Sequence, residues 1–581
     1  MCGHGVVPDW GLKIPKRNIA PEEGKETVMI QNPILPGFHP DPCIARRGED
    51  FYICVSSFEW MPGLPVYHSR DLKHWELVTN IITSERQAEL RKLPASKGIW
   101  APSLTWCEED GLFYIVYGIM NSMDGRYFDI DNFLMTAPEI CGLWSEPVYL
   151  HSAGFDASML HDGEKKYIVS LEWETREGYQ KPGGICLCEY DPVKKKVKDY
   201  PKRISMGATK RGCLEAPHLT KHEGKYYLMC AEGDTGYYHA VTMQRAEAPF
   251  GPYVSDPENP ILTSNEAEND ERADTDHLKP RYFSPDAPLQ KCGHGSYTDT
   301  GRGEACLVHL CSRPFTPELR CTLGRESAIQ KMRWTEDGWL RMADGGRIAK
   351  KEVEEPDIPE WIPEENSLSL VFPERTLFDD FKEETLPIFY YAPRILPETF
   401  ASLKERPDYI RIRGQEAPTS KNRVSFLARK LTGLSCTLTT KMDFFPERYQ
   451  HSAGLMLYYD NLDFLYLRKY FSETLGKSAL AILQMENGEK TEHLETRIPV
   501  EEREIYLRLK IRERSVQFSY GFDGEAFEKI GECFDISKLS DEFCSEGEFT
   551  GTMAGLLVCD RLFHKKYADF DFFEYKVEEE G

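Results

Sequence analysis

The stretch RRGEDFYICV at 46–55 joins a charged, glycine-containing turn to a run of aromatic and β-branched residues. A run of this kind next to turn residues is typical of a β-strand. The same plan returns in four later stretches: EEDGLFYIVY at 108–117, HDGEKKYIVS at 161–170, HEGKYYLMCA at 222–231 and GRGEACLVHL at 301–310. The repeat predicts a fold that is built from equivalent β-units.

A shorter motif lies about ten residues before each of these runs. The residues that head it are Asp41, Trp100, Asp156, Glu215 and His294. The first four heads are 56 to 59 residues apart, and the last interval is 79 residues because of an acidic, proline-containing insertion at 265–290. A period near 60 residues with several short strands per unit predicts one propeller blade per repeat, and so five blades. Because the innermost strands of a propeller line its axis, we expect the five heads to converge on one central space.

The strand pattern changes beyond Phe372 to strict alternation of apolar and polar residues, which is typical of an antiparallel sandwich. The alternating stretches are YIRIRG at 409–414, CTLTTKMDF at 436–444, GLMLYYD at 454–460, FLYLRKYF at 464–471, IYLRLKIR at 505–512 and VQFSYGF at 516–522. One short helix is expected at 84–92. The sequence therefore predicts an all-β chain, a five-bladed β-propeller followed by a β-sandwich, divided into an N-terminal extension at 1–30, a propeller at 31–349, a linker at 350–372 and a sandwich at 373–581.

Length and composition set outer bounds on the function. With 581 residues the chain is long enough for two large domains, and its formal net charge of -24 argues against a nucleic-acid partner or an anionic membrane surface. No stretch reaches the about 18 uninterrupted apolar residues of a membrane-spanning helix. The 17 cysteines include no C-x-x-C pair, and the first residues lack an apolar leader segment. These features favour reduced cysteines and a cytoplasmic protein.

Three carboxylates beside aromatic residues around an axis suit the cleavage of an acetal. Hydrolysis of a glycosidic bond needs a carboxylic acid that protonates the leaving oxygen and a carboxylate opposite it, roughly 6.5–9.5 Å away when that carboxylate activates water. A third carboxylate would keep the acid protonated by like-charge repulsion. Asp41, Asp156 and Glu215 could fill these roles. The alternative is that Asp41 and Asp156 cap turns and that Glu215 is solvated, but their common position in the repeat favours a shared task.

The other two motif heads keep two interpretations each. His294 could hold a metal or a water, or it could be a core histidine with satisfied hydrogen bonds, and the second interpretation is favoured because no matching ligand accompanies it. Trp100 could form a wall on which a sugar stacks or could simply fill the core.

Eight stretches together resemble glycoside hydrolase family 43, especially its β-xylosidases with an appended concanavalin A-like sandwich. They are NPILPGFHPDP at 32–42, SSFEWMPGLPVYHSRDLKHW at 56–75, GIWAPSL at 98–104, GFDASMLHD at 154–162, EAPHL at 215–219, AEGDTGYYHAVTM at 231–243, GHGS at 293–296 and LGRESAIQ at 323–330. SLKERPDYIRIRG at 402–414 and HSAGLMLYYDN at 451–461 resemble the second domain of that family.

The resemblance implies a five-bladed propeller with single-displacement, inverting chemistry. It implies that Asp41 is the general base, that Glu215 is the general acid and that Asp156 tunes and orients this acid. Matching positions for substrate binding are Phe58, Trp100, Phe155, Trp173, Thr235, His294, Arg325 and Phe549, the last from the sandwich. A pocket that Phe549 closes would make the enzyme exo-acting. The chain departs from the family in Cys43, which replaces a small hydroxyl residue, in the insertion at 265–290 and in the tail at 1–30.

The leading hypothesis is an exo-acting inverting β-xylosidase that releases xylose from non-reducing ends of β-1,4-xylo-oligosaccharides, with α-L-arabinofuranosidase activity as an alternative or an addition. A non-catalytic carbohydrate-binding propeller is the alternative of another class, and an endo-acting arabinanase would need an open groove. Xylo-oligosaccharides or arabinose-substituted small substrates are the expected partners. The hypothesis requires no cofactor and leaves open a structural Ca²⁺ ion and a homodimer or homotetramer.

Overall fold

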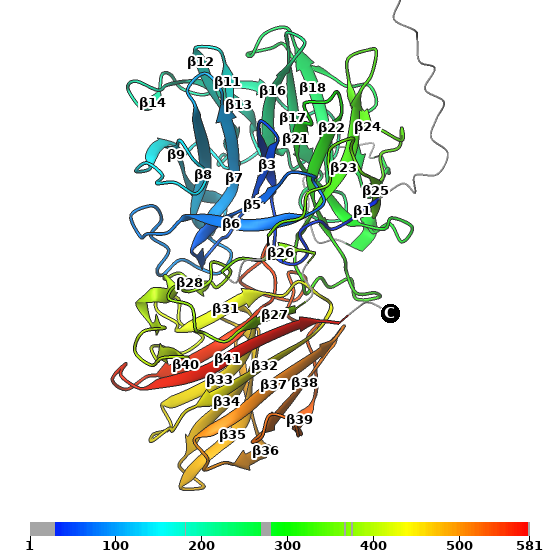
Figure 1. Cartoon of the computed structure of the whole chain (residues 1–581). Coiled ribbons are helices and arrows are strands. Elements are labelled where there is room, and N and C mark those ends of the chain that lie inside the picture. Colours follow the sequence, from blue (N-terminus) through cyan, green and yellow to red (C-terminus); the bar gives the residue numbers. More distant parts are fainter. Residues whose placement is uncertain (1–28, 180–181, 269–279, 365–367, 374–375, 579–581) are drawn as a thin grey trace, which may run out of the picture.

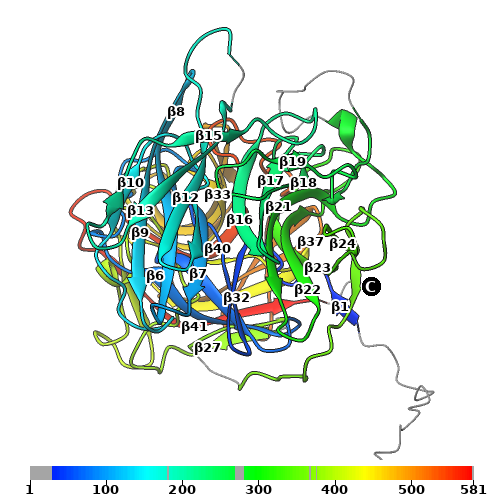
Figure 2. The same ribbon diagram turned by 90° about the horizontal axis from the view of Figure 1, so that it is seen from above.

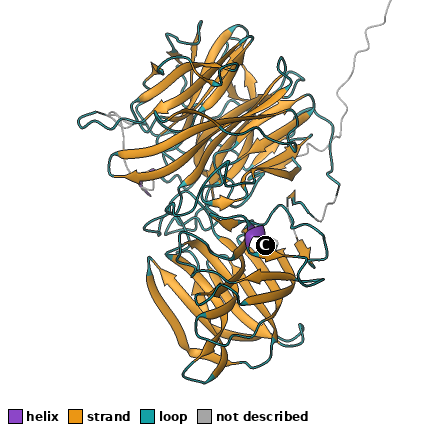
Figure 3. Ribbon diagram, turned by 90° about the vertical axis from the view of Figure 1, so that its left-hand side faces the viewer, coloured by secondary structure: helices purple, strands orange, loops and turns teal. Residues whose placement is uncertain are grey.

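The computed structural model describes residues 29–179, 182–268, 280–364, 368–373 and 376–578. Nearly all regular structure in these residues is β-strand (Figure 3), apart from two 3₁₀ turns, η1 (Pro280–Tyr282) and η2 (Pro397–Thr399). The prediction of an all-β chain is confirmed. The predicted extension at 1–30 lies almost wholly outside the described residues, as does part of the insertion at 265–290.

Among the described residues, five antiparallel sheets of four or five strands each occupy the N-terminal part of the chain, and they follow one another in sequence order around a common centre (Figure 2). The first contains β2 (Cys43–Arg47), β3 (Asp50–Cys54), β5 (Gly63–Ser69), β6 (Trp75–Ile82) and β26 (Val371–Phe372). The second contains β7 (Gly98–Cys107), β8 (Leu112–Asp124), β9 (Tyr127–Ala137) and β10 (Val148–His151). The third contains β11 (Ser158–Asp162), β12 (Lys165–Glu172), β13 (Gly184–Asp191), β14 (Lys196–Val197) and β15 (Lys202–Ser205).

The last two sheets of this part complete the circle. The fourth contains β16 (Glu215–His222), β17 (Lys225–Glu232), β18 (Ala240–Ala246), β19 (Val254–Ser255) and β20 (Leu262–Thr263). The fifth contains β21 (Gln290–Asp299), β22 (Ala305–Ser312), β23 (Glu326–Trp334) and β24 (Leu340–Met342). The first strands contact each other in the order β2, β7, β11, β16, β21 and back to β2, so they form the closed inner ring of a β-propeller.

The segment that follows the fifth sheet is tied to the propeller at two points. β25 (Glu352–Glu354) pairs with β1 (Met29–Gln31), and β26 extends the first sheet by pairing with β6. These edge pairings satisfy backbone groups that an isolated linker would leave to water. The domain boundaries derived from the sequence stay predictions.

The expected helix at 84–92 is absent, and this prediction was wrong. The segment forms isolated turns on a loop instead. The Gln87 side chain accepts a hydrogen bond from Thr83 N at 2.9 Å, and Lys92, at a positive φ of 71°, donates its N–H to Lys421 O in the sandwich at 2.6 Å. Within the segment, Ala88 N donates to Ser84 O at 3.3 Å in a single helical turn that is not continued. The contact of Lys92 with the sandwich takes a backbone N–H that a longer helix would have used internally.

Two antiparallel sheets form the C-terminal sandwich, which lies below the propeller in Figure 1. One contains β27 (Thr376–Asp379), β29 (Ala401–Ser402), β30 (Ile410–Arg413), β32 (Ser435–Asp443), β37 (Glu504–Arg512), β38 (Ser515–Gly521), β39 (Glu528–Asp535) and β41 (Tyr567–Val577). The other contains β31 (Phe426–Lys430), β33 (His451–Asp460), β34 (Asp463–Ser472), β35 (Lys477–Glu486), β36 (Glu489–Pro499) and β40 (Met553–Asp560). All six stretches singled out by their alternation fall on these strands, and three of them extend one residue beyond a strand end.

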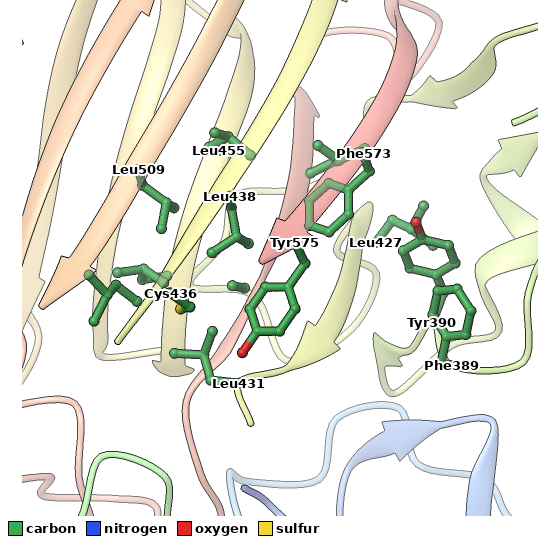
Figure 4. Packing of buried hydrophobic residues seen from close by; sticks show 14 of the residues in the cluster. Phe389, Tyr390, Leu427, Leu431, Cys436, Leu438, Leu455, Leu509, Phe573 and Tyr575 are labelled. Atoms are coloured by element: carbon green, nitrogen blue, oxygen red, sulfur yellow. The ribbon is translucent and has the colours of Figure 1, made fainter. Parts of the chain in front are cut away.

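The sandwich core comes from the inward-facing residues of both sheets. Leu438 and Leu509 on one sheet and Leu455 on the other are fully buried (Figure 4). A second apolar cluster crosses to the propeller, where Trp60 packs against Phe426 and β4 (Trp60–Met61) pairs with β28 (Ala392–Pro393). This packing fixes the sandwich against the face of the propeller that carries the site. No helix among the described residues is long and apolar enough to cross a membrane.

Candidate active site

Each innermost strand of the propeller has a residue in a left-handed backbone conformation two positions before its regular pairing with the second strand. These residues and their φ angles are Asp41 (54°), Ala101 (36°), Asp156 (54°), Ala216 (48°) and His294 (49°). The residues two positions further on begin the regular pairing with the second strand of each sheet: Cys43, Ser103, Ser158, His218 and Ser296. A positive φ is costly for a residue with a side chain and is typical of functional sites.

This register corrects one argument from the sequence. The three carboxylates do not share one position of the repeat: Asp41 and Asp156 occupy the left-handed position, whereas Glu215 lies one residue earlier, level with Trp100 and Phe155. Two successive residues of a strand opening can therefore reach the axis. The sequence carries a signal of this shift: Pro42, Pro102 and Pro217 each follow the left-handed residue directly, so alignment of these prolines places Asp41 level with Ala101 and Ala216.

The strand openings surround a cavity of about 740 Å³. It is lined by all eleven residues singled out from the sequence: Asp41, Phe58, Trp100, Phe155, Asp156, Trp173, Glu215, Thr235, His294, Arg325 and Phe549. A cavity of this size with convergent polar groups is the usual form of a small-molecule site.

Asp41 is 5% exposed and lies in a dense set of donors. Arg325 Nη1 donates to its Oδ1 at 2.8 Å and Arg325 Nη2 to its Oδ2 at 3.4 Å. Ser56 Oγ donates to Oδ2 at 2.7 Å while it accepts from Ala101 N at 2.7 Å, and His294 Nδ1 lies 3.5 Å from Oδ1. Burial raises the pKa of Asp41, but Arg325, His294 and Ser56 more than offset it and hold the pKa below its usual value. Asp41 is therefore ionised at neutral pH.

The other two carboxyls are shifted in the opposite direction. Burial and the charge of Asp41 raise the pKa of Asp156 to about 7, although Ala216 N donates to its Oδ2 at 2.9 Å. Burial raises the pKa of Glu215 well above its usual value, and the charges of Asp156, Asp234 and Asp41 add to this rise. The cavity thus holds an ionised carboxylate and a protonated carboxylic acid at neutral pH, which is the division of roles that acid–base catalysis needs.

Aromatic rings form a continuous wall along one side of the cavity. Trp100 packs against Phe58 with ring centres 5.8 Å apart and against Phe155 at 5.6 Å. Phe155 continues to Trp173 at 5.7 Å, and Trp173 stacks on Phe128 at 3.9 Å with the ring planes 10° apart. Apolar ring faces beside a few polar groups suit the alternating C–H and hydroxyl surfaces of a sugar.

The sandwich contributes Phe549 to the same cavity. Its ring lies 5.7 Å from Trp100 and 6.5 Å from Phe58, and its carbonyl oxygen accepts from Arg325 Nη2 at 3.0 Å and from Nε at 3.3 Å. Arg325 Nη1 also donates to Thr235 Oγ1 at 3.2 Å. Both domains are therefore needed to complete the site.

The surroundings of His294 are poor in free oxygen ligands. A Ca²⁺ ion takes about six to eight oxygens, whereas the oxygens of the neighbouring Asp41 already accept from Arg325 and Ser56. Within the described part of the chain, no group of three or more His, Cys, Asp and Glu residues is arranged to hold a metal. An axial Ca²⁺ ion stays a prediction, which melting with and without a chelator would test.

Several lining residues were not singled out from the sequence: Ala101, Met123, Gly125, Arg126, Phe128, Tyr179, Pro182, Cys213 and Asp234. Asp234 could have been found, because it adjoins Thr235 within the stretch at 231–243 and is a third charge that acts on Glu215. The residues around Phe128 come from the long hairpin of β8 and β9, whose sequence carries no signal that it folds over the cavity.

An ionised carboxylate and a protonated one in an aromatic cavity on a propeller axis are the groups that a glycoside hydrolase needs. The comparisons agree with this class. Residues 30–340 match the family Glycosyl hydrolases family 43, and residues 378–576 match the Beta xylosidase C-terminal Concanavalin A-like domain. The chain belongs to glycoside hydrolase family 43.

The similarity to known members extends over both domains. A beta-xylosidase of Bacillus subtilis (strain 168) is 38% identical, with 94% of this chain and 100% of the relative covered. Xylosidase/arabinosidase 43B of Humicola insolens is also 38% identical, over 94% and 98%. The crystal structure of xylan beta-1,4-xylosidase from Bacillus halodurans C-125 is 41% identical, covers 94% of this chain and 100% of its own and superimposes with a TM-score of 0.87.

Proposed function

We propose that this chain is an exo-acting, inverting β-xylosidase that releases xylose from the non-reducing ends of β-1,4-xylo-oligosaccharides. One observation carries the proposal: the cavity pairs an ionised Asp41 with a Glu215 whose pKa is raised well above its usual value. Glu215 then protonates the leaving oxygen, and Asp41 removes a proton from the water that attacks the anomeric carbon. Asp156 keeps Glu215 protonated by its proximity and charge.

Substrate binding falls to the remaining residues of the cavity. Arg325 lines the cavity and is held against Asp41, and the rings of Phe58, Trp100, Phe155 and Trp173 offer the apolar wall. Thr235 and His294 add polar groups to the lining. Phe549 closes one side of the cavity from the sandwich, which supports removal of single terminal sugars over internal cleavage. The same closure speaks against an endo-acting arabinanase.

α-L-arabinofuranosidase activity is the alternative or additional function. The Humicola insolens relative is named a xylosidase/arabinosidase, and the two sugars place similar hydroxyls around the bond that breaks. Parallel assays with nitrophenyl β-xyloside and nitrophenyl α-L-arabinofuranoside rank the two activities. If only the arabinofuranoside is cleaved, the protein is an α-L-arabinofuranosidase and not a β-xylosidase. If neither sugar is released and both are bound, the protein is a carbohydrate-binding propeller.

The stereochemistry of the product tests the mechanism directly. A β-xyloside cleaved by single displacement yields α-xylose first, which proton NMR detects before the anomers equilibrate. β-Xylose as the first product would contradict the assignment of Asp41 as a base and would make it a nucleophile.

We also propose that the protein works in the cytoplasm and as a homodimer or homotetramer. Support for a reducing compartment comes from the cysteines of the described residues, which form no disulfide. Cell fractionation tests the location, and light scattering on an eluting size-exclusion peak measures the oligomeric state.

A further inference from the structure

A buried ion pair joins the two domains outside the catalytic cavity. Lys291 Nζ, on β21 of the propeller, lies 2.5 Å from Glu542 Oε1, on the sandwich segment at 536–552. The two side chains are 1% and 9% exposed. Neither residue lines the cavity, although Lys291 lies three positions before His294, which does.

The rest of the pair is satisfied by neighbours from both domains. Glu542 Oε2 accepts from Cys321 N at 2.9 Å, and the ammonium of Lys291 lies 5.2 Å from the centre of the Tyr237 ring. The charge of Asp541, also on the sandwich segment, acts on Lys291 as well. Moving one element away from the other would leave each buried charge without compensation, which is strongly destabilising. The pair therefore holds its two elements in one arrangement.

The segment at 536–552 docks along the propeller segment at 319–325. Thr552 N donates to Thr322 O at 3.0 Å. Gly324, at a positive φ of 73°, approaches a backbone carbonyl of the sandwich segment so closely that a Cβ atom would collide with it. Arg325 follows Gly324 directly in the sequence, so this close backbone contact lies next to Arg325.

We propose that Lys291 and Glu542 are positioning residues for catalysis. They hold the segment at 536–552 so that the carbonyl of Phe549 keeps the Arg325 guanidinium on Asp41. The links are the pair itself, the segment, the hydrogen bonds from Arg325 to Phe549 O at 3.0 and 3.3 Å, and the bond from Arg325 to Asp41 at 2.8 Å. This inference rests on the proposed function only in treating Asp41 as the base.

A merely structural ion pair would affect stability and nothing else. A positioning pair also affects the protonation of the base, because Arg325 is the strongest single influence that lowers the pKa of Asp41 against burial. If the segment loosens, Phe549 O withdraws and the guanidinium gains freedom to leave Asp41. Small displacements of catalytic groups cost much in rate, about 100-fold for about 1 Å.

The test is the double variant K291M/E542Q in the full chain. It removes one charge of each sign, so the net charge near the site is unchanged, and the amide oxygen of the introduced glutamine can still accept from Cys321 N. We expect kcat to fall about 10-fold to 100-fold. We also expect the acidic limb of the pH profile of kcat/KM to move upward by about 0.5 to 1 pH unit, because Asp41 loses part of its ion pair. Hydrogen exchange of the amides at 543–551 should become faster.

The matched control is K477M/E501Q, which removes an exposed ion pair of the same sandwich with N and O atoms 2.8 Å apart. It should keep the wild-type rate, pH profile and exchange. The proposal is overturned if K291M/E542Q matches this control in kcat and in its acidic limb, even when its melting temperature is lower. Because both buried charges are removed together, the variant avoids the unpaired charge that would endanger folding of either single variant.

The variant is compared with the wild type on whichever glycoside the wild type cleaves. A wild type that cleaves no glycoside refutes the proposed function. Hydrogen exchange at 543–551 then still decides whether the pair holds the segment: exchange at the wild-type rate in K291M/E542Q overturns the inference.

Discussion

Arg325 Nη1 donates to Asp41 Oδ1 at 2.8 Å, and the same guanidinium donates to the carbonyl of Phe549 at 3.0 Å. Arg325 thus joins Asp41, the proposed general base on the propeller, to a backbone carbonyl of the sandwich. A guanidinium remains charged at any working pH, and its planar set of donors can bind both partners at once. This arrangement explains why a carboxylate as buried as Asp41 is ionised at neutral pH.

Replacement of Arg325 by methionine should deprive Asp41 of its cation while keeping most of the side-chain volume. Burial then dominates, the pKa of Asp41 rises, and the acidic limb of kcat/KM should move upward by about 1 pH unit or more. The rate at pH 6 should fall by about 100-fold or more. Arg302→Met, at an exposed ion pair, is the control and should leave the profile unchanged. An unmoved acidic limb in Arg325→Met would show that another group sets it.

Glu215→Gln should separate protonation of the leaving group from attack by water on the anomeric carbon. A substrate with a poor leaving group depends on protonation by Glu215, so its cleavage should fall by about 100-fold to 10,000-fold. Nitrophenyl β-xyloside, whose leaving group needs little protonation, should lose much less activity. The variant should also lose the alkaline limb of the profile, because that limb reports Glu215. Equal losses on both substrates would contradict the assignment of Glu215 as the acid.

The fold was readable from sequence because its signals are local. A charged turn followed by an aromatic or apolar run lies in a β-hairpin in each of the five repeats, the first being β2 and β3 at 46–55, and strict alternation marks the sandwich strands. The carboxylates Asp41, Asp156 and Glu215 were found through their place in the repeat. The one-residue offset of Glu215 was missed, because it shows only when Pro42, Pro102 and Pro217, which follow the left-handed residues, are aligned with one another.

Contacts between distant segments could not be derived from the residues alone. Lys291 and Glu542 are 251 positions apart, and nothing in either local sequence identifies the other as its partner. Arg325 and Phe549 entered through family resemblance. The guanidinium lies 5.2 Å from the centre of the Phe549 ring, but the hydrogen bonds between the two residues use a backbone carbonyl, which every residue type carries. The sequence therefore indicates which side chains serve the site, whereas the docking of two domains decides how they are held.

Phe549→Ala should distinguish the ring of Phe549 from its carbonyl. The substitution keeps the acceptor for Arg325 but removes the ring that packs against Trp100 and Phe58. We expect KM for xylobiose to rise about 10-fold, because buried aromatic contact is lost, while the acidic limb stays in place. Xylo-oligosaccharides should also be cleaved with less preference for short chains. An acidic limb that moves with this variant would mean that the ring, and not the carbonyl, holds Arg325.

Asp156→Asn tests the charge that keeps Glu215 protonated. Asparagine retains an oxygen that can accept from Ala216 N, so the turn is preserved. Without the negative charge of Asp156 the pKa of Glu215 falls, and the alkaline limb of kcat should move to lower pH by about 1 unit. Asp344→Asn, at an exposed position, should leave this limb unchanged. A limb that moves upward would contradict the role of Asp156.

Asp156→Asn should also change how protein stability depends on pH. The direction of this change follows from the raised pKa of Asp156, about 7 instead of 3.8. A group with a raised pKa in the folded state contributes stability that is complete below its unfolded pKa and is lost as the pH rises through the folded pKa. The wild type should therefore lose stability between about pH 4 and pH 7 that Asp156→Asn does not lose. Melting temperatures of the two proteins should agree near pH 4, and the variant should melt about 2 °C or more above the wild type at pH 8. Equal melting temperatures at both pH values would mean that Asp156 ionises in the folded protein without cost.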